Sequence, residues 1–479
     1  MSEREGNRIA VRDPRTGETE FWLTCASRED VAARCRTLRR AQPAWGEAPL
    51  EHRIGVMQRW AERIEAHRAA ITEADARDTG HGQISQIAVD MMLGVIRHQS
   101  YAAPAAFKQA QRQGRSPAMP HIAYDTVLKP YPVVGVISPW NAPTMLSMLH
   151  AIPPLFAGCA VLTKPSEVTP RFVEPLRRSV EDVPELAAVF DFVLGDGETG
   201  AAVVENVDMV SFTGSVPNGR RVAEACARRL IPCELELGGK DPAIITATAD
   251  LDAAASAVLR GAVTSTGQVC FSIERVYVAA SVHDEFVRRL IEKAERIQVN
   301  YPDPTSGHLG PFIAARQAEI VDAHLDYAVA KGARIRSGGK SFTLGGGSYM
   351  RATVLTDVTH DMQIMKDETF GPVIPVMRFK DDDEAVALAN DTYFGLSAAV
   401  LAGTEAEALK IARRVNAGNV SVQDAFLTFA AAPAESDSFA CSGIGGKRSG
   451  VQRYLRRQAL LINSVRPACL LEEGLKAAG

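Results

Sequence analysis

The sequence has no uninterrupted apolar run of about eighteen residues, the length that a membrane-spanning helix requires. Its first residues, Met-Ser-Glu-Arg-Glu-Gly-Asn, lack the apolar segment of a secretory signal peptide. It also lacks an excess of basic charge, because 53 Lys and Arg face 57 Asp and Glu, for a formal net charge of -4. These absences predict a cytoplasmic protein with no membrane anchor and no nucleic-acid partner.

Cysteine is scarce and scattered along the chain. The 8 cysteines do not form the short-range pairs that are typical of disulfide scaffolds or of metal sites. They are Cys25, Cys35, Cys159, Cys226, Cys233, Cys270, Cys441 and Cys469. The sequence therefore predicts free thiols in a reducing compartment and no metal centre.

The composition is that of an ordinary globular protein, with 46% hydrophobic and 23% charged residues. A chain of 479 residues is too long for one core, so we expect two or three packed units. From Tyr131, short apolar runs closed by Pro or Gly alternate with helical patterns, which is typical of a parallel α/β sheet covered on both faces. The expected strands are Val133–Ile137, Ala160–Thr163, Phe190–Leu194, Met209–Phe212 and Cys233–Glu236, and the expected helices are Thr144–Phe156 and Pro217–Arg229.

A second α/β pattern begins after Gly238-Gly239-Lys240 and continues to about Val422. Its first elements are a strand at Pro242–Thr246, a helix that Asp250 caps and that runs towards Ser265, a strand at Arg275–Ala279 and a helix at Val282–Ile297. Two further features are an amphipathic helix at Pro49–Ala74 and a surface loop at Gly338–Ser348.

Polar residues follow the apolar runs, at the edge where parallel sheets bind ligands. Asn141 follows the first run, Glu236 ends the fifth, and Cys270 lies in a turn between a helix and a strand. Taken singly, they indicate a turn residue, a paired surface carboxylate and a buried inert thiol. Taken together, they supply an amide donor, a base and a nucleophile at sheet ends.

Six segments resemble motifs of the aldehyde dehydrogenase superfamily, in the family's order and spacing. They are Pro139-Trp140-Asn141, Lys164-Pro165-Ser166-Glu167, Phe212-Thr213-Gly214-Ser215 with Gly219, Glu236-Leu237-Gly238-Gly239-Lys240, Gly267-Gln268-Val269-Cys270 with Arg275, and Glu368-Thr369-Phe370-Gly371-Pro372. The resemblance covers nearly the whole chain, from about Trp45 to Ser464. One such motif would be weak support, but six in register indicate a hydrolytic, non-acylating enzyme that uses NAD(P).

The resemblance implies a covalent mechanism on Cys270. The thiolate attacks the aldehyde, and the Asn141 amide with the Cys270 backbone N–H stabilises the oxygen that becomes charged. Hydride transfer to the nicotinamide leaves a thioester, and Glu236 acts as the general base for its hydrolysis. Family members that pass the acyl group to coenzyme A tend to lack this base, so its presence favours the free acid.

The resemblance also implies NAD as the cofactor. The residues that it places there are Trp140, Lys164, Ser166, Glu167, Gly195, Gly214, Ser215, Gly219, Leu237, Gly238, Glu368 and Phe370. Gly214 to Gly219 opens a helix whose N-terminus can face a phosphate, although its spacing is not Gly-x-Gly-x-x-Gly. Glu167 would hold the adenosine ribose and repel a 2′-phosphate, so NADP is less favoured, an effect that Lys164 partly offsets.

By the same resemblance, the fold is a variant Rossmann cofactor domain, an α/β catalytic domain and a small β oligomerisation element. The cofactor domain would take residues 1–115 and 131–239, the catalytic domain 240–422, and the oligomerisation element 116–130 and 455–475. Residues 423–454 would form the substrate-entrance loop and the return to the cofactor domain. An exposed apolar strand invites pairing, so we expect a homodimer or a homotetramer.

The substrate is a small-molecule aldehyde whose identity the motifs leave open. Residues placed at the pocket are small or apolar, and no Arg stands among them to hold a carboxylate: Ala142, Leu146, Leu149, Val269 and Phe271. This set favours an apolar or aromatic aldehyde over a semialdehyde acid, unless its members are simply packed core. The alternatives are a semialdehyde or coenzyme A-acylating dehydrogenase and, in another class, a non-catalytic structural protein on the same fold.

Overall fold

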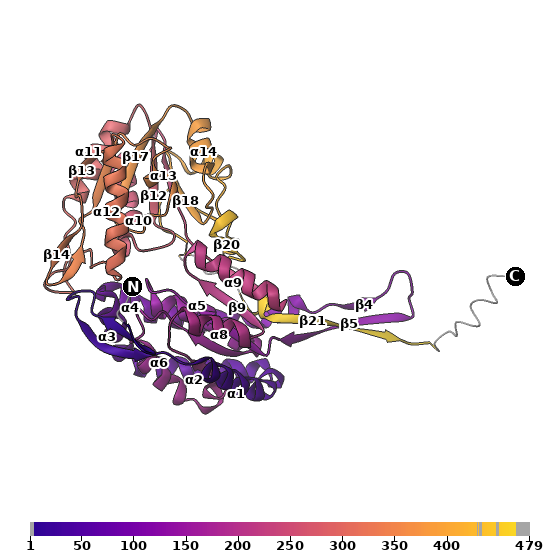
Figure 1. The fold of residues 1–479 in the computed structure, drawn as a ribbon. Coiled ribbons are helices and arrows are strands. Elements are labelled where there is room, and N and C mark those ends of the chain that lie inside the picture. Colours follow the sequence, from indigo (N-terminus) through magenta and orange to yellow (C-terminus); the bar gives the residue numbers. More distant parts are fainter. Residues whose placement is uncertain (1–3, 429, 431–433, 447–449, 466–479) are drawn as a thin grey trace.

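A computed structural model describes residues 4–428, 430, 434–446 and 450–465. Figure 1 shows two α/β bodies, one above the other, and a narrow β arm that projects sideways from the lower body. The chain passes from the sheet of the lower body to that of the upper body between Glu236 and Asp241. The predicted α/β class is confirmed, and the exact limits of the domains stay a prediction.

The lower body is built on a six-stranded sheet of order β20-β10-β9-β6-β7-β8. The strands are β6 (Val133–Ile137), β7 (Ala160–Lys164), β8 (Phe190–Phe192), β9 (Met209–Thr213), β10 (Cys233–Glu236) and β20 (Gly443–Ile444). All neighbours pair in parallel except β20, which pairs antiparallel with β10. Every residue of β6, β7 and β9 is buried, which explains why these strands are continuous apolar runs.

Helices flank this sheet, and two of them begin at its carboxyl edge beside the residues singled out above. They are α5 (Pro143–Ala157), α6 (Val173–Glu181), α7 (Pro184–Ala187), α8 (Gly197–Asn206) and α9 (Val216–Arg229). α5 starts two residues after Asn141, and α9 starts after Gly214-Ser215. The alternation of strand and helix that the sequence predicted is confirmed.

The N-terminal part adds a small sheet and four helices to the lower body. The elements are β1 (Arg4–Glu5), β2 (Arg8–Arg12), β3 (Thr19–Thr24), α1 (Arg28–Glu47), α2 (Leu50–Ala66), α3 (Arg68–Thr79) and α4 (Gly82–Ala110). The prediction of one helix over Pro49–Ala74 is wrong, because α2 ends at Ala66 and a separate helix, α3, begins after His67. Buried apolar residues continue on both sides of the break, as with Ile64 and Ile71, so apolar periodicity could not reveal it.

The upper body has a seven-stranded sheet of order β13-β16-β17-β12-β11-β18-β19, parallel except for the β13–β16 pair. Its strands are β11 (Asp241–Ile245), β12 (Ile273–Ala279), β13 (Arg334–Ser337), β16 (Thr353–Thr356), β17 (Val373–Phe379), β18 (Ser397–Leu401) and β19 (Asn419–Val422). Its helices are α10 (Leu251–Val263), α11 (His283–Ala294), α12 (Ala315–Ala330), α13 (Gln363–Lys366), α14 (Asp382–Asn390) and α15 (Glu405–Ala412), with the 3-10 turn η1 (Thr264–Gly267) after α10. Two further 3-10 turns, η2 (Ala440–Ser442) and η3 (Val451–Tyr454), follow later in the chain, and η3 packs against α4 and α5 of the lower body.

The segment Gly338–Ser348 is not the plain surface loop that its glycines suggested. β14 (Phe342–Leu344) and β15 (Gly347–Tyr349) form an antiparallel hairpin there. Gly345 and Gly346, with φ of 59° and 98°, make the turn that joins them. The glycines therefore mark a hairpin turn instead of an irregular loop.

The arm is a three-stranded antiparallel sheet of β4 (Gln113–Arg115), β5 (Ile122–Pro130) and β21 (Leu455–Asn463), drawn at the right of Figure 1. β21 pairs with β5 along all nine of its residues. Leu460, Leu461 and Ile462 are exposed on it. Residues 466–475 of the predicted oligomerisation element lie outside the described residues, as do 1–3 of the cofactor domain and 429, 431–433 and 447–449 of the predicted entrance segment.

Within the described ranges, no helix combines the length and the apolar character that crossing a membrane would require.

Candidate active site

Cys270 lies just after a strained turn that joins α10 to β12. Ser265 and Thr266 adopt left-handed backbone angles, with φ of 54° and 58°, and Gly267 follows with φ of 70°. A Cβ on Gly267 would overlap the carbonyl oxygen of Gly371, so only glycine fits. Left-handed conformations of residues other than glycine store strain and occur often at functional sites. The predicted helix up to Ser265 thus ends earlier, at Val263, and gives way to this turn.

The side chain of Gln268 fixes the turn from within. Its amide Nε2 donates to the Ser265 carbonyl at 3.2 Å, and its Oε1 accepts from the Ile313 backbone N–H at 3.0 Å. The Asn141 amide Nδ2 in turn donates to the backbone carbonyl of Gln268 at 2.9 Å. The structure therefore brings Asn141 of the lower body to the Cys270 turn of the upper body.

A buried carboxylate anchors the helix that follows Asn141. Asp75 of α3 accepts hydrogen bonds from the Thr144 backbone N–H at 3.3 Å and from its hydroxyl at 2.6 Å, in the first turn of α5. Ser85 of α4 also donates to Asp75, at 2.6 Å. Burial raises the pKa of Asp75, whereas these three donors lower it. The anchor connects three helices at the point where the chain leaves Asn141.

Glu236 ends β10 and faces the same cavity as Cys270. Its Oε2 accepts a hydrogen bond from the Ser438 hydroxyl at 3.1 Å, and its Oε1 has no partner among the described residues. Burial raises the pKa of Glu236 to about 7. Burial also raises the pKa of the Cys270 thiol, and the Glu368 and Glu236 carboxyls add to the effect. The resting cysteine is therefore a thiol, and its proton needs an acceptor nearby.

Glu368 is the second buried carboxyl near Cys270. Its Oε1 accepts from the Gly239 backbone N–H at 3.0 Å, and burial raises its pKa to about 8. It occupies the space where a Cβ on Gly238 would stand, which explains the glycine. Glu368 does not line the cavity that Cys270 and Glu236 share. Its carboxyl is thus less well placed than Glu236 to act on a substrate.

The carboxylate of Glu274 on β12, which is next to Arg275 of a third motif, joins two of the six motifs. It accepts from the Lys240 ammonium at 2.7 Å, from the Thr369 backbone N–H at 2.7 Å and from the Phe370 backbone N–H at 2.8 Å. Lys240 also donates to the Thr369 hydroxyl at 2.9 Å. Glu274 and Lys240 are both fully buried, so their charges balance each other inside the protein. This ion pair holds Phe370 in a left-handed conformation, with φ of 56°.

Next to this pair, the guanidinium of Arg275 has a structural task. It donates to the carbonyls of Lys240, Leu388 and Ala389, all within 3.1 Å. Arg275 therefore fixes the chain after the Gly238-Gly239 motif and contacts no part of the cavity.

The predicted cofactor residues gather around the carboxyl edge of the lower sheet. Lys164 pairs with Glu167 at 3.1 Å, and Glu167 keeps part of its carboxylate exposed. Ser215 precedes α9, and its side chain does not cap the helix, so the backbone N–H groups of Val216 and Asn218 can face an anion. Pro217 has no N–H, and the Gly219 N–H donates to the Ser215 carbonyl at 2.9 Å. A Cβ on Gly219 would overlap Leu237, which explains the close approach of α9 to β10.

Other predicted cofactor residues lie at the join of the two bodies. The rings of Trp140 and Phe370 meet edge to face at 5.5 Å between centroids. Gly195, with φ of 152°, lies between β8 and α8 in a conformation that suits glycine, and Ser166 is buried beside Glu167. In the described part of the chain, no group of three or more His, Cys, Asp or Glu side chains is arranged to hold a metal.

A cavity of about 310 Å³ opens onto Cys270 and Glu236. Of the five residues predicted for the pocket, Leu146, Leu149 and Phe271 line it, whereas Ala142 and Val269 do not. The walls are mostly apolar, and α4 supplies one of them. Sequence reasoning missed the wall that α4 supplies, with Met91, Gly94, Val95, His98 and Gln99, and it also missed His150 of α5. Ser438 and Arg453 line the cavity as well, and both lie in the segment 423–454 that the sequence predicts as the substrate-entrance loop. No motif marks the α4 residues, because they reach the cavity only through the packing of helices.

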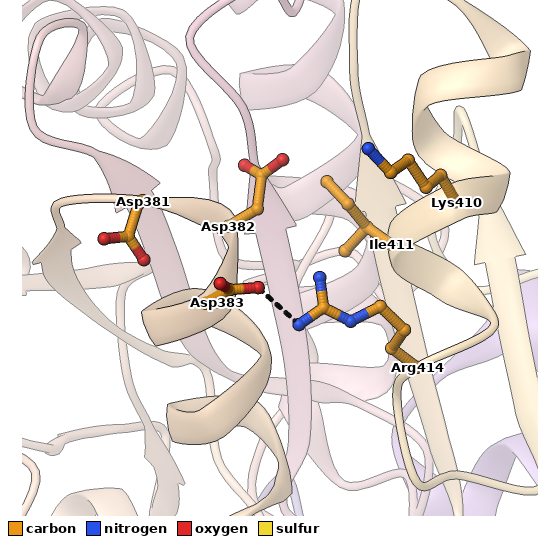
Figure 2. Close-up of a pocket in the computed structure, with 6 residues that line it drawn as sticks. All are labelled: Asp381, Asp382, Asp383, Lys410, Ile411 and Arg414. Carbon is orange, nitrogen blue, oxygen red and sulfur yellow. Dashed lines mark hydrogen bonds and ion pairs between the residues drawn. The ribbon is translucent and has the colours of Figure 1, made fainter.

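A second hollow opens on the surface of the upper body, between α14 and α15 (Figure 2). Its walls are charged, with Asp381, Asp382, Asp383, Lys410 and Arg414 beside Ile411. Asp383 pairs with Arg414 at 2.6 Å, and Asp381 caps α14 through the Glu384 N–H. Asp381 and Asp383 therefore have structural partners. No cysteine or serine lines the hollow, so we assign the chemistry to the cavity at Cys270.

The chain resembles known proteins of one family. The model of the aldehyde dehydrogenase family matches residues 1–460. A protein of Mycolicibacterium smegmatis, provisionally named succinate-semialdehyde dehydrogenase [NADP(+)], is 35% identical over 94% of this chain and 88% of its own.

Solved structures show the same fold. A protein of Anabaena variabilis, provisionally named aldehyde dehydrogenase PutA, matches with a TM-score of 0.93 and 49% identity, over 97% of this chain and 99% of its own. Betaine aldehyde dehydrogenase of Staphylococcus aureus, solved in complex with NAD+, matches with a TM-score of 0.91 and 30% identity, over 97% and 93% of the two chains.

We predict that Glu274→Gln destabilises the protein by about 3–5 kcal/mol, because it leaves the Lys240 ammonium buried without a counter-charge. Thermal and denaturant unfolding of the purified variant measure the loss. The matched control is Glu285→Gln, which breaks an ion pair with Arg288 on the exposed face of α11. Equal melting temperatures for the two variants would show that loss of the buried ion pair costs no more stability than loss of an exposed one.

Proposed function

The chain belongs to the aldehyde dehydrogenase family, and we propose that it oxidises an apolar or aromatic aldehyde to the carboxylic acid with NAD, through a thioester on Cys270. The observation that carries the proposal is the shared cavity, in which a cysteine thiol and an unpartnered, buried carboxylate oxygen face mostly apolar walls. A nucleophile next to a base whose pKa lies near neutral, in a mostly apolar cavity, is what this two-step reaction requires.

In the first step, the Cys270 sulfur attacks the aldehyde carbon, and the thiol proton passes to Glu236, whose pKa of about 7 suits an acceptor. The carbonyl oxygen becomes an oxyanion within a tetrahedral thiohemiacetal. The Asn141 amide has two N–H groups, and one of them is held by the Gln268 carbonyl. Its second N–H, with the Cys270 backbone N–H, is free to stabilise the oxyanion, and such a donor contributes roughly 2.7–4 kcal/mol.

The tetrahedral carbon then loses hydride, and NAD, when bound, supplies the acceptor for it. The residues of this chain fit such a cofactor. The first turn of α9 suits the pyrophosphate, Glu167 suits the adenosine ribose, and Trp140 with Phe370 flank the join at the carboxyl edge. The Lys164 ammonium is paired with Glu167, which leaves no free cation from this pair for a 2′-phosphate. This pairing supports NAD as the cofactor, whereas the name of the mycobacterial relative gives NADP.

Before the last step, Glu236 releases to solvent the proton that it took from the thiol. It then takes a proton from water as the water oxygen attacks the thioester carbon. The carbon–sulfur bond breaks, the acid leaves, and Glu236 returns its proton to the Cys270 sulfur. The unpartnered Oε1 of Glu236 is available to that water, because Ser438 occupies only Oε2. The retention of this base supports hydrolysis over acyl transfer to coenzyme A. The presence of all three catalytic candidates supports an enzyme over a non-catalytic relative.

The walls of the cavity support an uncharged substrate. Arg453 is the cation beside Glu236, and it pairs with Glu234 at 2.6 Å, so its charge is already balanced. A semialdehyde acid, as in the name of the mycobacterial relative, would have to bring its carboxylate into these mostly apolar surroundings. The semialdehyde remains the second candidate because that relative is 35% identical to this chain.

We also propose a cytoplasmic homo-oligomer. The cysteines in the described part of the chain are free thiols, which a reducing compartment preserves. The apolar side chains of β21 project from an arm that packs little against the rest of the chain, as Figure 1 shows, and pairing with a second copy would cover them. The molar mass in solution distinguishes a dimer from a tetramer.

We predict that kcat falls as the pH drops below about 7, because protonation of Glu236 removes the base. In Glu236→Gln this limb disappears, and steady-state turnover drops on the order of 10²–10⁴-fold. The initial burst of NADH is slower than in wild type, because the variant also lacks the acceptor of the thiol proton. Stopped-flow and steady-state absorbance measure both phases. Cys270→Ala should show neither phase, and a burst in that variant would overturn the assignment of the nucleophile.

We predict that Glu167→Gln lowers the ratio of kcat/KM for NAD to that for NADP about tenfold or more, because the carboxylate no longer repels a 2′-phosphate. Initial rates with each cofactor give the ratio. Glu174→Gln, on the exposed face of α6, is the control and should leave the ratio unchanged. An unchanged ratio in Glu167→Gln would mean that Glu167 does not face the ribose.

We predict that Leu461→Asp reduces the molar mass in solution to that of a smaller assembly, because a charge on the apolar strand opposes pairing between copies. Leu461 is 74% exposed in the single chain. Light scattering coupled to size exclusion measures the mass. Leu230→Asp introduces the same charge at a 93% exposed leucine on α9, and the mass should not change. A wild-type monomer would refute the proposed assembly.

A further inference from the structure

One face of α4 forms a wall of the cavity, and its character changes along the helix. Met91, Gly94, Val95, His98 and Gln99 line the cavity, at the spacing i, i+3, i+4, i+7 and i+8 of a single helix face. The first three residues are apolar or lack a side chain, and the last two carry polar groups. The wall therefore ends in a polar patch, which we define as His98 and Gln99.

One atom of each side chain in the polar patch has no hydrogen-bond partner among the described residues. The Nε2 of His98 and the Oε1 of Gln99 are both buried, and neither has a partner within the described ranges. Gln99 is only 4% exposed. Burying such groups without partners is costly, so natural proteins pair nearly all of them, often with a ligand. Two adjacent orphaned groups at the end of one cavity wall point to a partner that enters the cavity.

The charged and polar groups on the other walls have partners or tasks of their own. Arg453 pairs with Glu234, the His150 ring meets the Thr213 hydroxyl at 3.1 Å, and Ser438 donates to Glu236. Glu236 serves the thioester, and the aldehyde oxygen is taken by Asn141 and the Cys270 N–H. The polar patch is therefore left for a second functional group of the substrate.

We propose that the substrate is an apolar aldehyde that carries a hydroxyl group, an alcohol or a phenol, which His98 and Gln99 bind. This inference rests on the proposed function and names the substrate class within it. A hydroxyl donates one hydrogen bond to an amide oxygen and accepts another from a ring N–H, so it satisfies both groups at once. It does so whichever way the Gln99 amide is turned. A carboxylate would bring an unbalanced charge among apolar walls.

The experiment compares kcat/KM with NAD for benzaldehyde, methylbenzaldehydes, 2-, 3- and 4-hydroxybenzaldehyde, 4-carboxybenzaldehyde, hexanal and 6-hydroxyhexanal. We expect at least one hydroxylated aldehyde to exceed its unsubstituted and methyl-substituted counterparts by about tenfold or more, because each satisfied buried group adds discrimination. Gln99→Leu and His98→Leu should each reduce that preference towards one. Gln86→Leu, at an exposed position of the same helix, should leave it intact.

Three results separate the possible outcomes. If wild type oxidises the panel without preferring a hydroxylated member, or if the preference survives both leucine substitutions, the inference is overturned while the proposed function stands. If 4-carboxybenzaldehyde is the best substrate, the uncharged class is wrong. If no aldehyde yields NADH, the proposed function itself fails. Gln99→Met keeps the size of the side chain, so a lost preference in this variant with an unchanged melting temperature excludes misfolding as the cause.

Discussion

The buried ion pair between Glu274 and Lys240 is the interaction on which the site depends. Lys240 follows the Gly238-Gly239 segment that joins the two bodies, and Glu274 lies on the strand that follows the nucleophile turn. The same carboxylate holds the Thr369 and Phe370 N–H groups of the loop that reaches the cofactor side. One charge pair therefore fixes the base segment, the nucleophile strand and the cofactor loop relative to one another. Such a pair is tolerable inside a protein only when its remaining lone pairs and protons are also satisfied, as the Thr369 hydroxyl does for Lys240.

Burial decides the acid–base behaviour of this site. In water, Cys270 would be more acidic and Glu236 would be fully ionised at neutral pH. Inside the cavity, burial raises the pKa of the thiol and raises that of Glu236 to about 7. The higher pKa of the thiol opposes its ionisation at rest, and the raised pKa of Glu236 makes this carboxylate a better acceptor for the proton that the thiol loses as it attacks. The strained turn at Ser265 and Thr266, together with Gln268, holds that thiol opposite its base.

Selectivity is built from parts of the chain that are remote from the chemistry. The cavity walls come from α4, α5, the Cys270 turn and the segment around Ser438 and Arg453. The catalytic residues need only carbonyl chemistry and would serve many aldehydes. The choice among aldehydes is left to the walls, where an apolar surface selects the body of the substrate and a few polar atoms select its functional groups. In our proposal, His98 and Gln99 supply the polar atoms that select the functional group of the substrate.

The sequence by itself determined the α/β class, five of the six strands of the lower sheet, β11 and β12 of the upper sheet, and the candidates Cys270, Glu236 and Asn141, because apolar runs and motif spacing are local properties of the chain. It did not reveal the break at His67 or the hairpin at β14 and β15, since neither changes the apolar pattern enough to be read. Only the tertiary structure decided which side chains line the cavity: Leu146 and Phe271 do, Ala142 and Val269 do not, and His98, Gln99 and Arg453 enter from remote segments. It also decided that Cys270 rests as a thiol. The physical reason is common to both, because burial and side-chain direction depend on what packs against a residue, and those neighbours lie far away along the chain.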